Sequence, residues 1–292
     1  MNDVEHVLSV QCKLGEGPLW SPNEQTLYWV DIQQMRLHRY VPGTGEHSFH
    51  QADRPVTAVG LRAEGDGFVT ACGHGLVYWN PFQSALDLVT NPISELPHMR
   101  FNDGKVDPRG RFWIGTMSDA QPEMAEGKLY RLDPDRTLHE MENNITISNG
   151  LAWSPDYTLM YYTDSLRRRI YVYDFDVDTG SISNRRVFAE LPEAEGQPDG
   201  MTIDRDGHIW SAVWDGWKII RFNPAGERVA EVKLPVARVT SCAFGGPNLD
   251  TLYITTAWAG LSDDERAAQP LAGDVFSLQT AIGGMDEPRY AG

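Results

Sequence analysis

Short apolar segments alternate with polar turns along almost the whole chain. The segments are rich in aromatic and β-branched residues, and Pro, Asp, Asn or Gly separate them, which is the pattern of β-strands joined by turns. The helical period of 3.6 residues is nearly absent. Only Leu261–Ala268, with four charged residues in succession, suggests a loop or a short solvated helical turn. The pattern therefore predicts an all-β protein.

This unit of pattern occurs six times. Each copy is an apolar strand, a tight turn and an aromatic-rich strand, and a third and a fourth strand follow most copies. The copies lie at Leu19–Ile32, Leu61–Cys72, Val106–Met117, Leu151–Ser165, Met201–Val213 and Cys242–Ala257. Four strands per unit and a period of roughly 40–50 residues predict a six-bladed β-propeller with four antiparallel strands per blade. No linker composition interrupts the chain, so we expect residues 1–292 to form a single domain.

The charge of the chain narrows its partners. A formal net charge of −16 and a pI near 4.8 disfavour binding to nucleic acid or to an anionic membrane, since both are polyanions. Acidic residues spread over a surface chiefly maintain solubility. We therefore expect a small-molecule ligand, no nucleic-acid or membrane partner, and a monomer or weak homo-oligomer.

Cysteine usage and the N-terminus point to the cytoplasm. The three cysteines, Cys12, Cys72 and Cys242, are scattered and odd in number, and no C-x-x-C motif occurs, which disfavours a disulfide framework or a cysteine-based zinc site. The first residues contain neither a basic region nor an apolar run of the signal-peptide type. No apolar run approaches the length of a membrane span. We expect a soluble, cytoplasmic protein.

Oxygen-bearing residues recur at the start of the repeat copies. The innermost strand of each propeller blade lines the central channel, so equivalent residues of the copies should surround the axis. Four copies have such a residue followed by Gly, and the other two have Thr57-Ala58 and Ser241-Cys242 nearby. The four steps are Glu16-Gly17, Asp103-Gly104, Asn149-Gly150 and Asp199-Gly200.

Two interpretations of these steps compete. An Asn-Gly or Asp-Gly step, such as that of Asn149, is also a common turn dipeptide. Turn chemistry explains Glu16 poorly, because Glu is not a favoured turn residue. Two Asn/Asp-type oxygens and a Glu at one place match a hard divalent cation, such as calcium, magnesium or manganese. Other catalytic signatures are missing, including H-E-x-x-H, G-x-S-x-G and the P-loop.

Several longer motifs carry a resemblance over essentially the whole chain. They are LGEGPLW around Glu16, RFNDGKVDPRGRFWIGTM from Arg100, ISNGLAWS around Asn149, QPDGMTID around Asp199, TSCAFGG from Thr240 and the final YAG. Together they resemble the regucalcin and sugar-lactone lactonase (gluconolactonase-like) family. The resemblance implies a six-bladed propeller with one divalent cation at the top of its channel.

The resemblance also implies roles for individual residues. Glu16, Asn149 and Asp199 would be the metal ligands, and Asp199 would also accept a proton. Arg100 and Asn102 would contact the substrate, whereas the repeat register alone points to the neighbouring Asp103. A further acidic substrate contact is expected after the GTM motif, and we assign it to Asp119. The region SDAQPEMAEG that contains Asp119 is shorter than in regucalcin, which leaves the substrate preference open.

The function implied is a metal-dependent lactonase of carbohydrate metabolism. It would open aldonolactones, such as the lactones of gluconate, galactonate, xylonate or arabinonate, to aldonic acids. The cation would be calcium, zinc, manganese, magnesium or ferrous iron. Two alternatives remain at this point: a metal-dependent esterase or organophosphate hydrolase, and a calcium-binding propeller without catalysis.

Overall fold

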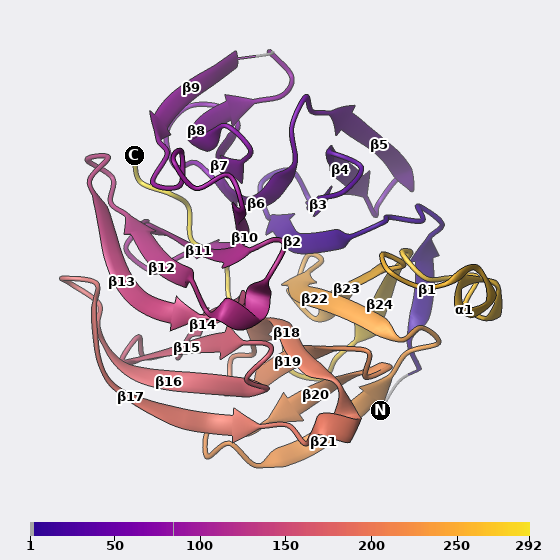
Figure 1. Cartoon of the computed structure of the whole chain (residues 1–292). Coiled ribbons are helices and arrows are strands. Elements are labelled where there is room, and N and C mark those ends of the chain that lie inside the picture. The colour runs from indigo at the N-terminus through magenta and orange to yellow at the C-terminus, as the bar shows by residue number, and fades with distance from the viewer. Residues whose placement is uncertain (1–2, 84) are drawn as a thin grey trace.

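The computed structural model describes residues 3–83 and 85–292. Six four-stranded antiparallel sheets surround a central axis, and their innermost strands gather near the middle (Figure 1). The prediction of a six-bladed propeller with four antiparallel strands per blade is confirmed. Helical structure in the described residues is limited to η1 (Pro122–Met124), η2 (Glu193–Glu195) and α1 (Asp263–Ala268). The helix α1 buries none of its residues and begins with a capping box between Ser262 and Glu265.

Five blades consist of consecutive strands, each ordered from the axis outward. Blade 1 contains β2 (Gly15–Ser21), β3 (Thr26–Asp31), β4 (Arg36–Val41) and β5 (Glu46–Gln51). Blade 2 contains β6 (Val56–Leu61), β7 (Phe68–Cys72), β8 (Gly75–Asn80) and β9 (Ala85–Thr90). Blade 3 contains β10 (Met99–Val106), β11 (Phe112–Ser118), β12 (Gly127–Leu132) and β13 (Leu138–Ile145). Blade 4 contains β14 (Ser148–Trp153), β15 (Leu159–Asp164), β16 (Arg169–Asp176) and β17 (Ser181–Glu190). Blade 5 contains β18 (Gln197–Ile203), β19 (Ile209–Trp214), β20 (Lys218–Phe222) and β21 (Arg228–Lys233).

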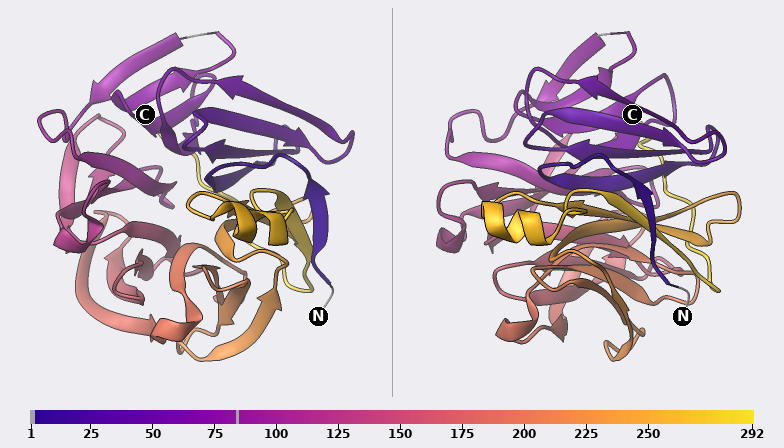
Figure 2. Two further views of the ribbon diagram at one scale, coloured as in Figure 1. Left: turned by 45° about the vertical axis from the view of Figure 1, so that its right-hand side comes forward. Right: turned by 90° about the vertical axis from the view of Figure 1, so that its right-hand side faces the viewer.

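The sixth blade joins the two ends of the chain. It contains β22 (Arg238–Gly245), β23 (Thr251–Ala257), β24 (Val275–Gln279) and, as its outermost strand, β1 (Glu5–Leu8). Strand β1 pairs antiparallel with β24 (Figures 1 and 2), and Asp274 accepts hydrogen bonds from the backbone N–H groups of Val10 and Gln11. The repeat pattern predicted no element for residues 5–8, because this strand lies a whole chain length from its partner.

The core lies between the blades, where the faces of adjacent sheets pack together. Strands β3, β7 and β11 are buried along their whole length, whereas the outer strand β9 is largely exposed. Large aromatic side chains fill the space between blades, among them Trp20, Trp29 and Trp113. This burial follows from the composition of the repeats, whose first and second strands carry these aromatic residues.

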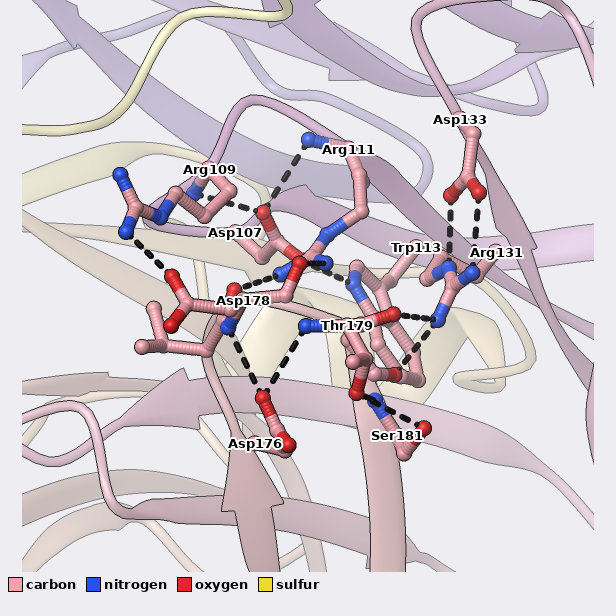
Figure 3. A network of polar contacts seen from close by, with 12 residues as sticks. Asp107, Arg109, Arg111, Trp113, Arg131, Asp133, Asp176, Asp178, Thr179 and Ser181 are labelled. Atoms are coloured by element: carbon pink, nitrogen blue, oxygen red, sulfur yellow. Dashed lines mark hydrogen bonds and ion pairs between the residues drawn. The ribbon is translucent and has the colours of Figure 1, made fainter.

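Buried polar groups brace neighbouring blades, as Figure 3 shows for blades 3 and 4. The carboxylate of Asp107 accepts hydrogen bonds from the backbone N–H and Nε of Arg111 and from Nε1 of Trp113 (2.9 Å). Arg111 and Arg131 then donate to carbonyl groups of residues 177–180, in the turn between β16 and β17. These contacts fix the inner part of blade 3 against blade 4.

The C-terminal segment crosses the end of the propeller at which the turns from first to second strands lie. Gly283 accepts a hydrogen bond from Arg205 of blade 5, and Tyr290 exchanges backbone hydrogen bonds with residues 61 and 63 of blade 2. The channel is narrow there: the cavity beside Asp103, Lys105 and Glu287 measures about 30 Å³. A wide cavity is found at the opposite end, where the inner strands begin. Among the described residues, no helix is long and apolar enough to cross a membrane.

Candidate active site and metal centre

Every inner strand contains a β-bulge at a corresponding place. The pairing register shifts between Glu16 and Leu19 in β2, and equivalent shifts occur in the other five inner strands. A bulge places an extra residue on one strand and redirects its side chains. Strict alternation of faces therefore does not hold at the position where the sequence places its oxygen-bearing residues.

The six bulges bring one polar residue from each blade to an equivalent position. The turn from the first to the second strand opens at Ser21, Arg62, Asp107, Ser154, Asp204 or Gly245, depending on the blade. The equivalent position is the fifth residue before this turn-opening residue. We call the six residues at this position the axial ring: Glu16, Thr57, Asn102, Asn149, Asp199 and Thr240.

Four members of the axial ring line one cavity of about 410 Å³: Glu16, Asn102, Asn149 and Asp199. The two threonines do not line it, because their hydroxyl groups bond elsewhere. Thr57 donates to the carbonyl of Ala71, and Thr240 donates to the carbonyl of Gly15. The cavity thus has oxygen-bearing side chains from blades 1, 3, 4 and 5.

The structure resolves the conflict between Asn102 and Asp103. Asn102 lines the cavity, whereas Asp103 lines the small space near the C-terminal segment and accepts a hydrogen bond from the N–H of Gly104. The register inferred from the repeats is therefore wrong by one residue in blade 3, and likewise in blade 6, where Thr240 and not Ser241 is in the ring. In blades 3 and 6 the steps Asp103-Gly104 and Ser241-Cys242 begin one residue after the axial-ring position. The bulge breaks the alternation of strand faces there, so the repeats alone do not show this offset.

Glycine allows the strands to approach closely beside Asn149. A Cβ atom on Gly150, whose φ is +24°, would lie 2.6 Å from the carbonyl oxygen of Asp199. The Asn-Gly step is therefore needed to bring β14 against β18. The segment ISNG combines a backbone requirement at residue 150 with a side chain directed into the cavity at residue 149.

Hydrogen bonds orient the two amides of the axial ring. Asn102 donates through Nδ2 to the carbonyl of Ser148 (2.7 Å) and to Oδ1 of Asn149 (3.0 Å). Asn149 donates through Nδ2 to Oγ of Ser165 (2.8 Å), which in turn donates to the carbonyl of Pro198 (2.7 Å). Both amide nitrogens are thereby engaged, and Oδ1 of Asn149 retains a lone pair because a carbonyl oxygen accepts two hydrogen bonds.

The two carboxylates of the ring lack positively charged partners in direct contact. Glu16 and Asp199 are 8% and 4% exposed, and Glu16 accepts one bond of 3.3 Å from the N–H of Gly17. Burial, followed by the negative charges of Asp199 and Asp103, raises the pKa of Glu16 well above its usual range. Burial, followed by the charge of Asp103, raises the pKa of Asp199 in the same way.

Asp199 Oδ1 is the only carboxylate oxygen among the buried side-chain atoms without a hydrogen-bond partner, over residues 3–83 and 85–292. A buried anionic oxygen without a partner is costly in free energy. Two carboxylates and one amide oxygen are hard donors of the kind that calcium, magnesium and manganese prefer. Their two negative charges match one dication. The residues present therefore fit a divalent cation.

Arg100 joins the axial ring to the outer rim of the cavity. Its Nη1 donates to Oδ1 of Asn102 (2.6 Å), and its Nε donates to Oδ1 of Asp119 (2.8 Å). The Asp119 side chain is 69% exposed and does not line the cavity. Asp119 thus contacts Arg100, and the guanidinium group of Arg100 lies between it and the ring.

Comparisons with known proteins show the family of the chain. The model of the SMP-30/gluconolactonase/LRE-like region matches residues 14–258. The chain belongs to this family. It is 38% identical to the regucalcin of Xenopus laevis, over 99% of this chain and 98% of the relative. It is also 38% identical to the pentonolactonase XacC of Haloferax volcanii, over 98% of this chain and 97% of the relative.

A solved structure of the family has the same fold. The calcium-binding protein regucalcin from Agrobacterium tumefaciens superposes with a TM-score of 0.94 at 30% identity, and the match covers 98% of this chain and 97% of that one. The resemblance inferred from the sequence motifs is thereby confirmed. The relatives of this chain thus include one that is named as a lactonase and one that is named as a calcium-binding protein.

A second group of metal-ligand types lies apart from the cavity in this gluconolactonase-family chain. Ligand atoms of Cys12, Asp31 and His38 lie within 4.8 Å of one another, and all three residues are buried. Their polar atoms already have partners. Asp31 accepts backbone hydrogen bonds from Lys13, Leu14 and Gln34.

The remaining two members of that group are also engaged. Nε1 of Trp29 donates to Sγ of Cys12 (3.4 Å), and Nδ1 of His38 lies 3.0 Å from Nε2 of His47. Burial lowers the pKa of His38 to about 3, so its imidazole is neutral. Because the polar atoms are satisfied, we interpret this group as a structural cluster that joins the segment before β2 to β3 and β4.

Sequence reasoning missed several side chains of the cavity wall, among them Trp214 and Arg238. One signal was available for Arg238. It lies seven residues before Gly245, as Arg100 lies seven residues before Asp107. The corrected blade register is needed to see this equivalence. Trp214 ends β19 and carries no comparable signal in the family motifs.

Proposed function

We propose that the protein is a divalent-metal-dependent hydrolase that opens sugar lactones to aldonic acids. The observation that carries this proposal is the partnerless carboxylate oxygen of Asp199 in the axial ring, beside Glu16 and Asn149, at the base of a polar cavity. Membership in a family with a named pentonolactonase supports the reaction type.

Glu16, Asn149 and Asp199 would hold the cation. When bound, it would supply Lewis acidity that polarises the lactone carbonyl and favours ionisation of water, which offsets the weak basicity of a carboxylate beside a positive charge. The all-oxygen donor set accepts calcium, zinc, manganese, magnesium or ferrous iron with different affinities.

Asp199 moves the proton in this proposal. Its free oxygen accepts a proton from water while the water oxygen bonds to the lactone carbonyl carbon. The bond between that carbon and the ring oxygen then breaks, and the ring oxygen takes the proton back from Asp199. One water is consumed, and the product is an open-chain hydroxy acid whose carboxyl group is ionised at neutral pH.

Arg100 and Asn102 position the substrate. The guanidinium group is fixed by Asp119 and Asn102, so its remaining N–H donors face hydroxyl and ring oxygens in a defined direction. Asn102 is itself held by Ser148 and Asn149. Asp119 acts on the substrate through Arg100 in this arrangement. Lactones of gluconate, galactonate, xylonate and arabinonate are the substrates that we expect.

The test is acid release from lactones, measured with a pH indicator. Purified protein is mixed with five- and six-membered aldonolactones before chelation, after chelation and after return of single cations. We expect acid release above the uncatalysed rate, its loss on chelation and its return with metal. Thr57→Ser is a matched control, since its hydroxyl faces the backbone, and it should behave as the parent protein.

The same panel decides between the lactonase and its alternatives. Acid release from no lactone by metal-loaded protein would contradict the proposal and favour a calcium-binding protein, a role that the name of the Agrobacterium tumefaciens relative supports. Hydrolysis of a phosphotriester in the absence of lactone opening would favour an organophosphate hydrolase.

A further inference from the structure

Two arginines occupy equivalent positions in opposite blades. The seventh residue before the turn-opening residue lies two positions before the axial-ring residue, at or near the start of each inner strand. We call this set the mouth ring: Leu14, Pro55, Arg100, Ile147, Gln197 and Arg238. Arg100 is in blade 3 and Arg238 is in blade 6, so they lie across the axis from each other. Both line the cavity.

Arg238 is held rigidly. Its Nε donates to Oδ1 of Asp215 (2.9 Å), its Nη1 donates to the carbonyl of Ala259, and its guanidinium carbon lies 4.8 Å from the ring centroid of Trp214. The side chain is 14% exposed. A guanidinium group on an aromatic ring with two further contacts loses little freedom when it binds a ligand.

The two arginines share one further property, an aspartate partner. Arg100 pairs with Asp119 at 2.8 Å, and Arg238 pairs with Asp215 at 2.9 Å. The charge of each arginine is therefore matched by an aspartate that does not itself line the cavity, and the arginine offers its remaining N–H donors to a ligand. The oxygen of a hydroxyl group accepts such hydrogen bonds, so such a wall matches a neutral polyol. An anionic substituent would need an unpaired cation instead.

Trp214 adds an apolar surface to the same wall. It lines the cavity beside Arg238 and also packs against the apolar core between blades 1 and 2. A sugar ring presents C–H groups as well as hydroxyls, and a fixed aromatic side chain beside a fixed donor is the combination that recognises both.

We propose that Arg238, held over Trp214, is a second substrate-recognition residue that binds the hydroxyl groups of a neutral sugar lactone from the side opposite to Arg100. This inference rests on the proposed lactonase function and adds a residue that distinguishes polyhydroxylated lactones from lactones without hydroxyl groups. Arg238 contacts Asp215, Ala259 and Trp214 and none of the proposed metal ligands. It therefore acts on binding of the sugar and not on the bond that breaks.

The test compares Arg238→Met with a matched control. Arg36→Met removes another arginine that stacks on an aromatic ring, 4.4 Å from the centroid of Phe49 and outside the cavity. The substrates are galactono-1,4-lactone and γ-butyrolactone, which share a five-membered ring but differ in hydroxyl groups. Thermal unfolding and manganese affinity are measured for both variants to separate recognition from folding and from metal binding.

We expect Arg238→Met to raise KM for the sugar lactone about tenfold or more, as loss of a charge-assisted hydrogen bond does, with kcat changed by less than about threefold. The kcat/KM for γ-butyrolactone and the manganese affinity should stay within about twofold. Arg238→Lys should raise KM less than Arg238→Met does. An unchanged KM, or equal losses on both lactones, would overturn the proposal, as would a wild-type preference for a phosphorylated lactone.

A failure of the proposed function is distinguishable from a failure of this inference. If wild-type protein opens no lactone, binding of galactonamide, a neutral open-chain polyol, to the manganese-loaded protein is measured by calorimetry. Weaker binding to Arg238→Met than to Arg36→Met would support the recognition role without catalysis. Equal binding to the two variants, or none to wild type, would overturn it.

Discussion

Asp199 and Asp204 lie five residues apart on one strand and its turn, and both are buried. Their surroundings are opposite. Asp199 Oδ1 has no partner, and burial together with the charge of Asp103 raises the pKa of Asp199. Burial alone would also raise the pKa of Asp204, but hydrogen bonds from His208, Trp210 and Arg221 outweigh it and lower that pKa.

This contrast between the surroundings of Asp199 and Asp204 corresponds to the two ends of the propeller. Asp204, like Asp107 in blade 3, opens the turn to the second strand and collects backbone, indole and guanidinium donors that stabilise the fold. Asp199 belongs to the axial ring, where carboxylates are buried beside each other without compensation. Uncompensated buried charge is tolerated in native proteins chiefly where function requires it. The comparison therefore indicates a stabilising role for Asp204 and supports the ligand role that we propose for Asp199.

The largest expected effect comes from Asp199→Asn. We expect kcat for lactone opening to fall by about 10³-fold or more, since the proton acceptor is lost and an anionic metal ligand becomes a neutral amide. The metal-free variant should be at least as resistant to urea as the parent, because a buried unpaired carboxylate has been removed. Steady-state kinetics and urea unfolding measure the two effects. Full activity with the metal still bound would sink the assignment of Asp199 as proton acceptor.

Asp204→Asn should have the opposite profile. Removing one partner of a buried ion pair leaves Arg221 without its carboxylate, and we expect the free energy of unfolding to fall by about 3 kcal/mol. The kcat of the protein that remains folded should change by less than about twofold, because Asp204 does not contact the cavity. Denaturant titration and active-site-normalised kinetics check both points. A stable variant with lost activity would reverse the comparison.

The two aspartates should also respond to pH with opposite signs. The pKa of Asp204 is lowered on folding, so its contribution to stability is present above about pH 4 and is lost as pH falls. The pKa values of Asp199 and Glu16 are raised, so the metal-free folded protein keeps protons that the unfolded chain releases above about pH 4. Their contribution therefore falls as pH rises.

Urea unfolding of metal-free protein across the pH range measures this difference. Relative to the parent, Asp199→Asn should gain stability as pH rises, and Asp204→Asn should lose more stability near neutral pH than in acid. Metal binding should release protons for the same reason, and calorimetry in buffers of different ionisation enthalpy counts them. Equal pH slopes for parent and Asp199→Asn would show that Asp199 is not protonated in the metal-free state.

The smallest effect is expected at Thr240. It belongs to the axial ring by register, but its hydroxyl donates to the carbonyl of Gly15. Thr240→Val should cost about 1 kcal/mol of unfolding free energy for the lost hydrogen bond and should leave manganese affinity within about twofold. Chemical unfolding and metal titration measure these values. A large loss of metal affinity would mean that ring membership alone, and not the direction of the side chain, decides binding.

Much of the fold was predictable because it is repetitive. Six copies of one pattern determine blade number and strand number from local signals, and the motifs around Glu16, Asn149 and Asp199 locate the residues that meet in the cavity. The closing strand β1 was not predictable in this way, since its pairing with β24 depends on contacts across the whole chain. Asp103 was favoured over Asn102 by the repeats because a bulge breaks the alternation from which register is read.

The cavity wall shows a second limit of sequence reasoning. Arg238 can be identified as the counterpart of Arg100 only when the register of blade 6 is known, and the bulge in β22 determines that register. Its orientation depends on Asp215 and Trp214 from the neighbouring blade. Contacts between blades are tertiary, and no local pattern encodes them. The same holds for Asp119, whose bond to Arg100 depends on how the segment after β11 folds back.

The most direct test of the account is the location of a bound cation. Anomalous difference density from a crystal soaked in manganese should show one strong peak coordinated by oxygens of Glu16, Asn149 and Asp199, at about 2.0–2.3 Å. The peak should be weaker in a crystal of Asp199→Asn, which keeps only a neutral oxygen at that position, and undiminished in one of Asp204→Asn. Manganese only at Cys12, Asp31 and His38, or no ordered manganese in a protein that opens lactones, would contradict the central claim.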